Sequence, residues 1–221
     1  MSLRKALIWA AGLSLLAGGA AAEEPDIELG EEIYEICAPC HGPNGQGGGG
    51  GVYPRLAGMP IDYLSEQLRD FKKRVRTNIP MLPYATDREL SDEDILHVSA
   101  FLNQVRLATK LPKSDEAMDG LERLNQLKNV LQIPLAEGDV AKGKAHYDKA
   151  CGKCHGEDGF GHKKAPGLAG QHVPYMIKQI QLFVDEDREH RDAEDLFGDL
   201  DEAQIQDLMA YLTTLDDGLD Y

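Results

Sequence analysis

The chain has no excess of basic charge. Its 221 residues include 23 Lys and Arg against 38 Asp and Glu, a formal net charge of −15 at pH 7. No basic patch is dense enough to neutralise several phosphates, which excludes nucleic acid as a partner. The charge predicts instead that a docking partner presents a basic face, although excess carboxylates also suit a protein that works at high salt.

Long apolar runs are also missing, with one exception at the N-terminus. Residues 6–22 are mostly apolar, follow two basic residues and contain three glycines. The run is short for a transmembrane helix, and the alanines at 20–22 suit cleavage by a signal peptidase. We therefore expect a signal peptide at 1–22, export to the periplasm and no transmembrane helix after cleavage. The alternative is an uncleaved membrane anchor.

Cysteines are few, and their spacing argues against a disulfide framework. They form two copies of one motif, Cys-x-x-Cys-His-Gly, at Cys37, Cys40, His41 and at Cys151, Cys154, His155. Two thiols three positions apart on one helical turn can each add to a haem vinyl group, and the next histidine then lies under the iron as proximal ligand. A four-thiolate zinc site usually spaces its pairs about 15 to 20 residues apart, and a thioredoxin-like pair needs flanking strands. The motifs therefore predict two covalently attached haem c groups.

The two motifs belong to a tandem repeat. They lie 114 positions apart, and Leu56-Ala57-Gly58 recurs 112 positions later as Leu168-Ala169-Gly170. Deletions confined to connecting loops produce such a stepwise change, because solvated backbone tolerates them. We predict a first domain at 23–106, a linker at 107–136 and a second domain at 137–221.

Both domains are predicted to be helical. Apolar residues recur at helical spacing across 61–75 and 173–184, and no useful β-alternation occurs anywhere. A last helix begins in each domain after an expected N-cap, Ser91 or Asp201. The expected fold is all-α, with three or four short helices packed around each haem.

Two connecting segments allow alternatives. Leucines at helical spacing in the linker, from Leu121 to Leu131, predict an amphipathic helix. This helix either covers one flank of the domain pair or docks a partner subunit. The glycines at 47–51 are expected to pass close to a haem edge or to form a flexible surface loop.

The motifs resemble those of two-haem class I c-type cytochromes, in particular cytochrome c4 and the dihaem subunit of flavocytochrome c sulfide dehydrogenase. The resemblance rests on the Cys-x-x-Cys-His-Gly pairs, the Leu-Ala-Gly after each, Tyr-Leu-x-x-Gln-Leu-x-x-Phe at 63–71 and Leu-Ser-Asp-Glu-Asp-Ile at 90–95. It covers nearly the whole mature chain except the linker. It implies two tandem class I cytochrome c domains in a periplasmic electron carrier, with a histidine and usually a methionine on each iron.

Methionine is expected as the distal ligand in the first domain only. Met81 lies in the proline-bounded loop 78–83, where the family places this ligand. A thioether favours ferrous iron and raises the potential. Met59 is the weaker candidate, because it directly follows Leu-Ala-Gly. The predicted axial pair of the first haem is therefore His41 and Met81.

The corresponding window of the second domain, 191–193, contains no methionine. Met176 and Met209 are expected to pack inside the domain. His190 lies beside the window, and as a distal ligand opposite His155 it would lower the potential of the second haem. The alternatives are an open or water-held sixth position, or ligation by His162 or His172.

Electron transfer is favoured over catalysis. A carrier needs fixed geometry, tuned potentials and a docking face for redox proteins, but no catalytic acid or base. An enzyme would use an open second haem for peroxide or sulfur chemistry, with His190 or Glu194 over the iron. A third possibility is a tightly bound electron-transfer subunit of a dehydrogenase.

The two attachment sites have a direct test. The purified secreted protein should be coloured, with two haems per chain that stay on the polypeptide in acidified acetone, because both are held covalently. The measurement is the haem content of the protein before and after extraction. A colourless protein, or loss of all haem to the solvent, would contradict the motif interpretation.

Overall fold

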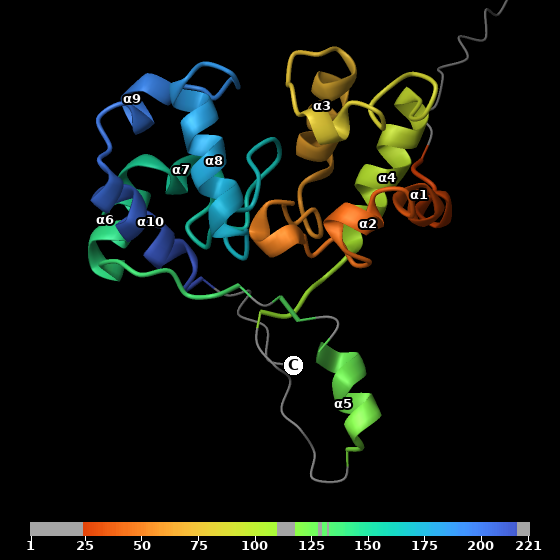
Figure 1. Ribbon diagram of the computed structural model, residues 1–221, viewed down its shortest axis with the longest axis horizontal. Coiled ribbons are helices and arrows are strands. Elements are labelled where there is room, and N and C mark those ends of the chain that lie inside the picture. Colours follow the sequence, from red (N-terminus) through yellow and green to blue (C-terminus); the bar gives the residue numbers. More distant parts are fainter. Residues whose placement is uncertain (1–23, 110–117, 128–129, 132, 216–221) are drawn as a thin grey trace, which may run out of the picture.

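The computed structural model describes residues 24–109, 118–127, 130–131 and 133–215. The predicted signal peptide lies outside these residues. The described chain is helical and contains only isolated β-bridges, which confirms the all-α prediction. None of its helices is both long and apolar enough to cross a membrane. Figure 1 shows two lobes side by side, one formed by each repeat.

The helices of the two lobes correspond in order. The first lobe contains α1 (Ile27–Tyr34), α2 (Ala38–His41), η1 (Gly49–Gly51), α3 (Ile61–Lys72), η2 (Ile79–Met81) and α4 (Asp92–Gln104). The second contains α6 (Val140–Ala150), α7 (Gly152–His155), α8 (Val173–Val184), α9 (Ala193–Phe197) and α10 (Glu202–Leu212). The second lobe thus has one short helix, α9, more than the predicted three or four. Helix α9 lies where the first lobe has the 3-10 turn η2.

Local signals explain where the last helices begin. Ser91 caps α4 and Asp201 caps α10, and each forms a reciprocal capping box with the third residue of its helix. These side chains satisfy backbone N–H groups that have no partner within the first helical turn. Both N-caps expected from the sequence are confirmed.

The first and last helices of each lobe cross in close backbone contact. The crossing requires a glycine in both lobes. A Cβ at Gly30 of α1 would overlap the carbonyl of His97 on α4, and a Cβ at Gly143 of α6 would overlap that of Asp207 on α10. The cores lie beside these crossings, around Tyr34 in the first lobe and Tyr147 in the second.

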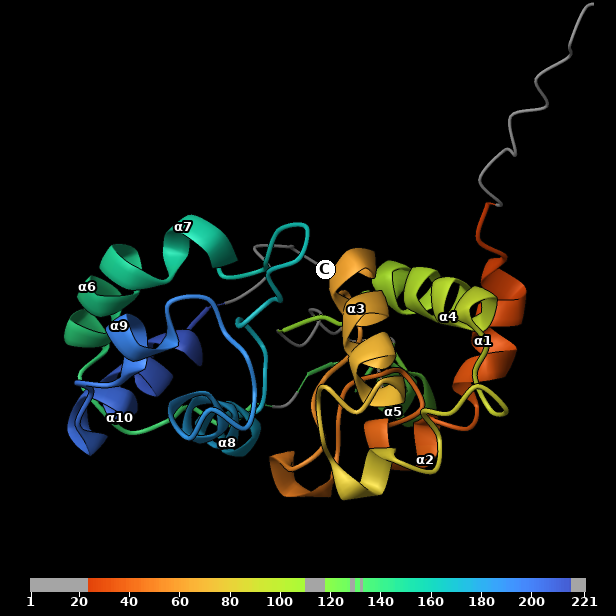
Figure 2. The ribbon, with the colours of Figure 1, turned by 90° about the horizontal axis from the view of Figure 1, so that it is seen from above.

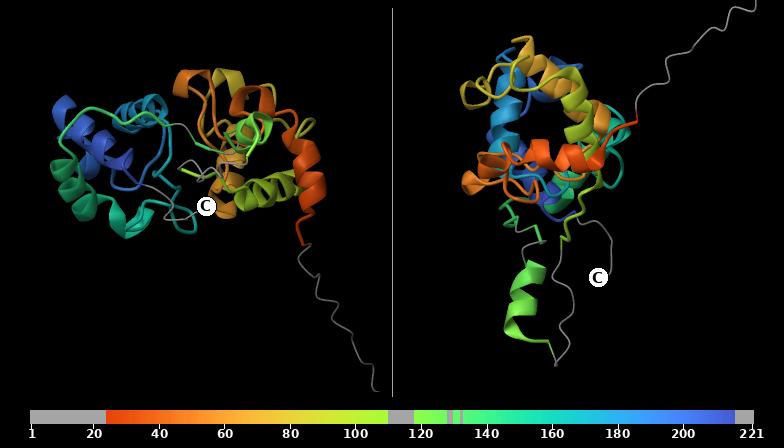
Figure 3. Two further views of the ribbon diagram at one scale, coloured as in Figure 1. Left: turned by 90° about the horizontal axis from the view of Figure 1, so that it is seen from below. Right: turned by 90° about the vertical axis from the view of Figure 1, so that its right-hand side faces the viewer.

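The two ends of the linker lie together. Ala108 and Val130 form an isolated parallel bridge, and the N–H of Leu131 donates to the carbonyl of Ala108 at 2.8 Å. Between these ends α5 (Gly120–Leu127) projects away from both lobes (Figures 1 and 3). Leu121 is 69% exposed and Leu124 is 59% exposed. The prediction that this helix covers a flank of the domain pair is therefore wrong.

Candidate functional site: two cysteine and histidine crevices

Each lobe places its two cysteines and its histidine on one short helical turn, α2 or α7. A buried tyrosine fixes the end of each turn by a hydrogen bond. The Tyr34 hydroxyl donates to the carbonyl of Gly42, and the Tyr147 hydroxyl donates to that of Gly156, both at 2.6 Å. These glycines have φ of 81° and 86°, a region that favours glycine. The glycine after each histidine therefore allows the chain to change direction at the end of the helical turn.

A second hydrogen bond orients each histidine. His41 Nδ1–H donates to the carbonyl of Pro54 at 3.0 Å, and His155 Nδ1–H donates to that of Pro166 at 2.9 Å. This arrangement sets the tautomer and leaves Nε2 as the nitrogen for a metal. Burial lowers the pKa of both histidines, and the hydrogen-bonded carbonyl opposes this shift only in part. Both rings are therefore held as neutral imidazoles, the form that binds iron.

None of the four cysteines forms a disulfide in the structure, so the disulfide alternative does not apply. Burial raises the pKa of Cys37 and of Cys151 to about 11. Among the described residues, no group of three or more His, Cys, Asp or Glu could hold a bare metal ion. Two thiols and one oriented imidazole per lobe are the donor set of a covalently attached haem, and the residues present fit that group.

In the first lobe the two candidate methionines differ in environment. Met59 is 2% exposed within the core, and its carbonyl accepts a hydrogen bond from Asn103 Nδ2 at 2.9 Å. Met81 ends η2 and is half-buried; its N–H donates to the carbonyl of Asn78 at 2.9 Å. Met59 thus has a packing role, and Met81 stays the predicted distal ligand.

In the second lobe His190 faces the proximal histidine. The ring centroids of His155 and His190 are 6.3 Å apart, and the ring planes differ by 15°. His190 Nδ1–H donates to the carbonyl of Arg191 at 2.7 Å. The His190 ring also contacts Phe183 and Phe197, with centroid distances of 4.8 and 5.2 Å. The structure thus brings together two histidines that are 35 residues apart in the sequence.

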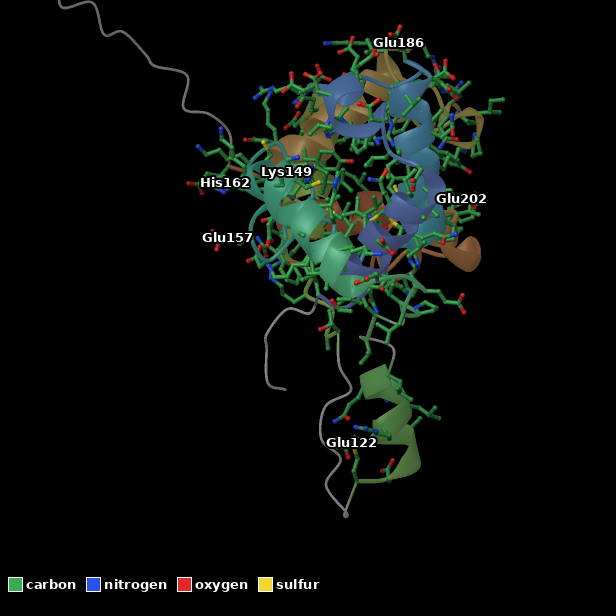
Figure 4. The ribbon with its side chains drawn as sticks, turned by 90° about the vertical axis from the view of Figure 1, so that its left-hand side faces the viewer. Glu122, Lys149, Glu157, His162, Glu186 and Glu202 are labelled. Atoms are coloured by element: carbon green, nitrogen blue, oxygen red, sulfur yellow. The ribbon has the colours of Figure 1, made fainter. Side chains whose placement is uncertain are left out.

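The other candidates of the second lobe lie elsewhere. Met176 and Met209 are buried in its core. His162 is exposed, and Figure 4 shows it at the periphery of the lobe. His172 does not fit the alternative of a distal ligand, because its Nε2–H donates to the carbonyl of Gln46 in the first lobe at 2.9 Å. It is an interdomain contact.

The two crevices are held relative to each other by α3 and α8, which lie on facing sides of the lobes (Figures 1 and 2). Equivalent residues of the two lobes meet there. Arg76 donates to Gln67 within its own lobe, and to Tyr175 and Gln179 across the interface. Arg188 donates to Gln179 within its own lobe, and to Tyr63 and Gln67 across it. Each pair of equivalent residues is 112 positions apart, so the interface has pseudo-two-fold symmetry.

Two further contacts in this interface lack such symmetry. Gln171 binds the backbone of Arg55 twice, accepting from its N–H at 2.9 Å and donating to its carbonyl at 3.0 Å. The glycine loop of the first lobe packs against the start of α8, because a Cβ at Gly47 would meet His172 and a Cβ at Gly51 would meet Pro174. The loop is thus not a flexible surface loop, and its expected position near a haem edge stays a prediction. It is an interdomain contact.

Sequence reasoning missed this network, although a signal was present. Tyr63 and Tyr175 are 112 positions apart in the sequence, and so are Gln67 and Gln179. Arg76 and Arg188 have the same spacing of 112. Polar residues that recur at the same spacing in both copies indicate a shared role, which here is an interface between the copies.

Two equivalent sites, each with paired cysteines and a carbonyl-oriented imidazole, define a dihaem c-type cytochrome. The chain belongs to the cytochrome c family, whose model matches residues 27–106 and 140–216. It carries two covalently bound haem c groups and transfers electrons.

Similar proteins match over most of the chain. A cytochrome c-552 from Acidithiobacillus ferridurans is 29% identical over 219 residues, which cover 96% of this chain and 86% of that protein. A thiosulfate dehydrogenase electron acceptor from Stutzerimonas stutzeri is 29% identical over 221 residues, which cover 92% of this chain and 91% of that protein. The structure of reduced cytochrome c4 from Pseudomonas stutzeri has the same fold, with a TM-score of 0.65 at 22% identity, covering 87% of this chain and all of that one.

The arginine network predicts how the lobes are coupled. Replacing Arg76 and Arg188 together by alanine removes four hydrogen bonds across the interface. A hydrogen bond to a charged group contributes about 1.5–3 kcal/mol, so this loss weakens the coupling between the lobes. The two lobes of the double variant should then unfold in two separate calorimetric transitions. Arg88→Ala is the control, because the Arg88 side chain is 91% exposed. An unchanged single transition in the double variant would contradict this role.

Proposed function

We propose that the protein is a periplasmic carrier that receives electrons from one redox protein and passes them to another. Each haem, when bound, supplies one reversible one-electron iron couple. The observation that supports this role is the pair of equivalent crevices joined by one hydrogen-bonded interface. Such an arrangement holds two redox groups at a fixed separation.

The chain's own residues orient and shield these groups. The carbonyls of Pro54 and Pro166 prevent rotation of the two proximal rings. The interdomain contacts of Arg76 and Arg188 restrict hinge motion between the lobes. When the two lobes keep a fixed geometry, the protein changes its structure less during each electron transfer. No proton transfer at a side chain is required.

The docking surface for a basic partner is proposed on the second lobe. Segment 185–202, which contains α9 and surrounds His190, has ten acidic residues and two basic ones. Glu186 and Glu202 lie at its surface (Figure 4). The corresponding segment of the first lobe, 73–92, has four basic residues and three acidic ones. The two lobes therefore present opposite charge beside their distal sites, which favours different partners for electron entry and exit.

A dehydrogenase is the proposed donor. The relative from Stutzerimonas stutzeri is named as an electron acceptor of thiosulfate dehydrogenase. An oxidoreductase that acts on a small inorganic sulfur compound is therefore the donor class to examine first. The acidic segment predicts that this donor docks with a basic surface.

Charge attraction gives the docking proposal a kinetic test. With a positively charged redox protein as donor, the bimolecular rate should fall about tenfold or more between ~10 and ~300 mM salt, because salt screens the attraction. A triple variant, Glu186→Gln, Glu194→Gln and Asp195→Asn, should lose most of this dependence in stopped-flow measurements.

The matched control removes three exposed acidic residues from α1, as Glu28→Gln, Glu31→Gln and Glu32→Gln. This variant changes the net charge equally but leaves segment 185–202 intact. It should keep most of the salt dependence. Equal losses in the two triple variants would contradict a docking site on the second lobe.

Met81 is proposed as the distal ligand of the first haem. Met81→Ala should abolish the one methionine-to-iron charge-transfer band of the oxidised protein. It should also lower the first midpoint potential by on the order of 100 mV, within the roughly 0.8 V that axial ligands span. Met59→Leu, a volume-conserving core change, should keep both properties. A band that survives in Met81→Ala would exclude Met81.

A further inference from the structure

The second lobe has an alternative to the missing methionine. His155 and His190 stand with ring centroids 6.3 Å apart and planes within 15° of parallel. This separation exceeds that of two imidazoles in direct stacking contact. Centroids 4.5–7 Å apart also occur in ordinary aromatic pairs, so the distance identifies a site only together with the nitrogens that the rings leave available.

The separation agrees with that of two imidazoles on opposite sides of one metal ion. A bond from a metal to an imidazole nitrogen is about 2 Å long. The atoms of a five-membered ring lie about 1 Å from its centre, given bonds of about 1.3 Å. An ion bound between two opposite nitrogens thus holds the ring centres about 6 Å apart. The observed distance matches this value.

Both rings also present the correct nitrogen. Nδ1–H of His155 donates to the carbonyl of Pro166, and Nδ1–H of His190 donates to that of Arg191. Each ring therefore keeps Nε2 for the metal, and the carbonyl increases the basicity of that nitrogen. Two histidines with parallel rings 6.3 Å apart, both with Nε2 left available, form the candidate ligand pair.

The His190 ring is fixed by aromatic contacts. Phe183 and Phe197 pack against it and against each other, with 5.7 Å between the phenylalanine centroids. The guanidinium of Arg188 lies over the Phe183 ring at 4.9 Å. Arg188 in turn is bound across the interface to Tyr63 and Gln67. The position of His190 is thus supported by the interface with the first lobe.

We propose that His190 is the sixth-position ligand of the second haem, opposite His155, and that Phe183 and Phe197 position its ring. This inference rests on the proposed two-haem function and deepens it. An imidazole donates more strongly to ferric iron than a thioether, so the second haem has a lower potential than a first haem ligated by Met81. Electrons that enter at the acidic second lobe then flow downhill toward the first.

The wild-type holoprotein tests the ligand set without any substitution. Near-infrared magnetic circular dichroism of the oxidised protein should show one methionine-ligated and one bis-imidazole low-spin haem. The reduced protein should bind carbon monoxide at neither haem rapidly. A high-spin second haem, rapid binding of one carbon monoxide per chain, or two methionine-ligated haems would overturn the proposal.

Variants of the full-length protein identify the residue. In His190→Ala the second haem should become high-spin and bind one carbon monoxide per chain, and added imidazole should restore the low-spin spectrum. His162→Ala, an exposed histidine of the same lobe, should leave the spectrum unchanged. A second haem that stays bis-imidazole in His190→Ala, or that changes in His162→Ala, would exclude His190.

A third variant covers the case in which His190→Ala does not fold. His190→Met keeps a ligand at this position, so it should add a second methionine-to-iron charge-transfer band and raise the second midpoint potential. An unchanged bis-imidazole spectrum in His190→Met would exclude His190. The carrier function would fail separately, if neither haem exchanged electrons reversibly with redox proteins, whatever the ligand of the second haem.

Discussion

The hydrogen bond from each motif histidine to a proline carbonyl is the interaction on which both sites depend. It joins the Cys-x-x-Cys-His turn to the loop that carries Leu-Ala-Gly, more than ten residues further along the chain. Without it, the imidazole could rotate about its side-chain bonds, and Nε2 would have no defined direction. With it, a short helix of four residues, α2 or α7, presents thiols and nitrogen as one rigid unit.

The two copies of this unit are joined by residues that occur in both of them. Helices α3 and α8 carry the same tyrosine and glutamine, and the same arginine follows each helix and reaches into the opposite lobe. A surface that is complementary to itself can bind a second copy of itself, as in two-fold homodimers. Here both copies belong to one chain, so the linker holds them at high effective concentration.

The lobes differ most on the distal side of the crevices. One has a proline-bounded turn with Met81 and a basic segment, and the other has α9, His190 and an acidic segment. The proximal sides are nearly identical in hydrogen bonding. Differences confined to the distal side change potential and partner choice without disturbing the covalent attachment of the haem. Under the proposed ligand set, this separation allows two similar domains to perform unequal tasks.

The amino-acid sequence alone determined the all-α fold, the two haem attachment motifs and the N-caps Ser91 and Asp201. These features depend on residues a few positions apart, so helical periodicity and motif spacing are sufficient to identify them. Only the tertiary structure decided which histidine faces His155, that α5 projects from the lobes, and that the glycine loop and both interface arginines join the domains. These contacts connect residues tens to more than a hundred positions apart, and they arise from how the packed lobes meet, which no local pattern encodes.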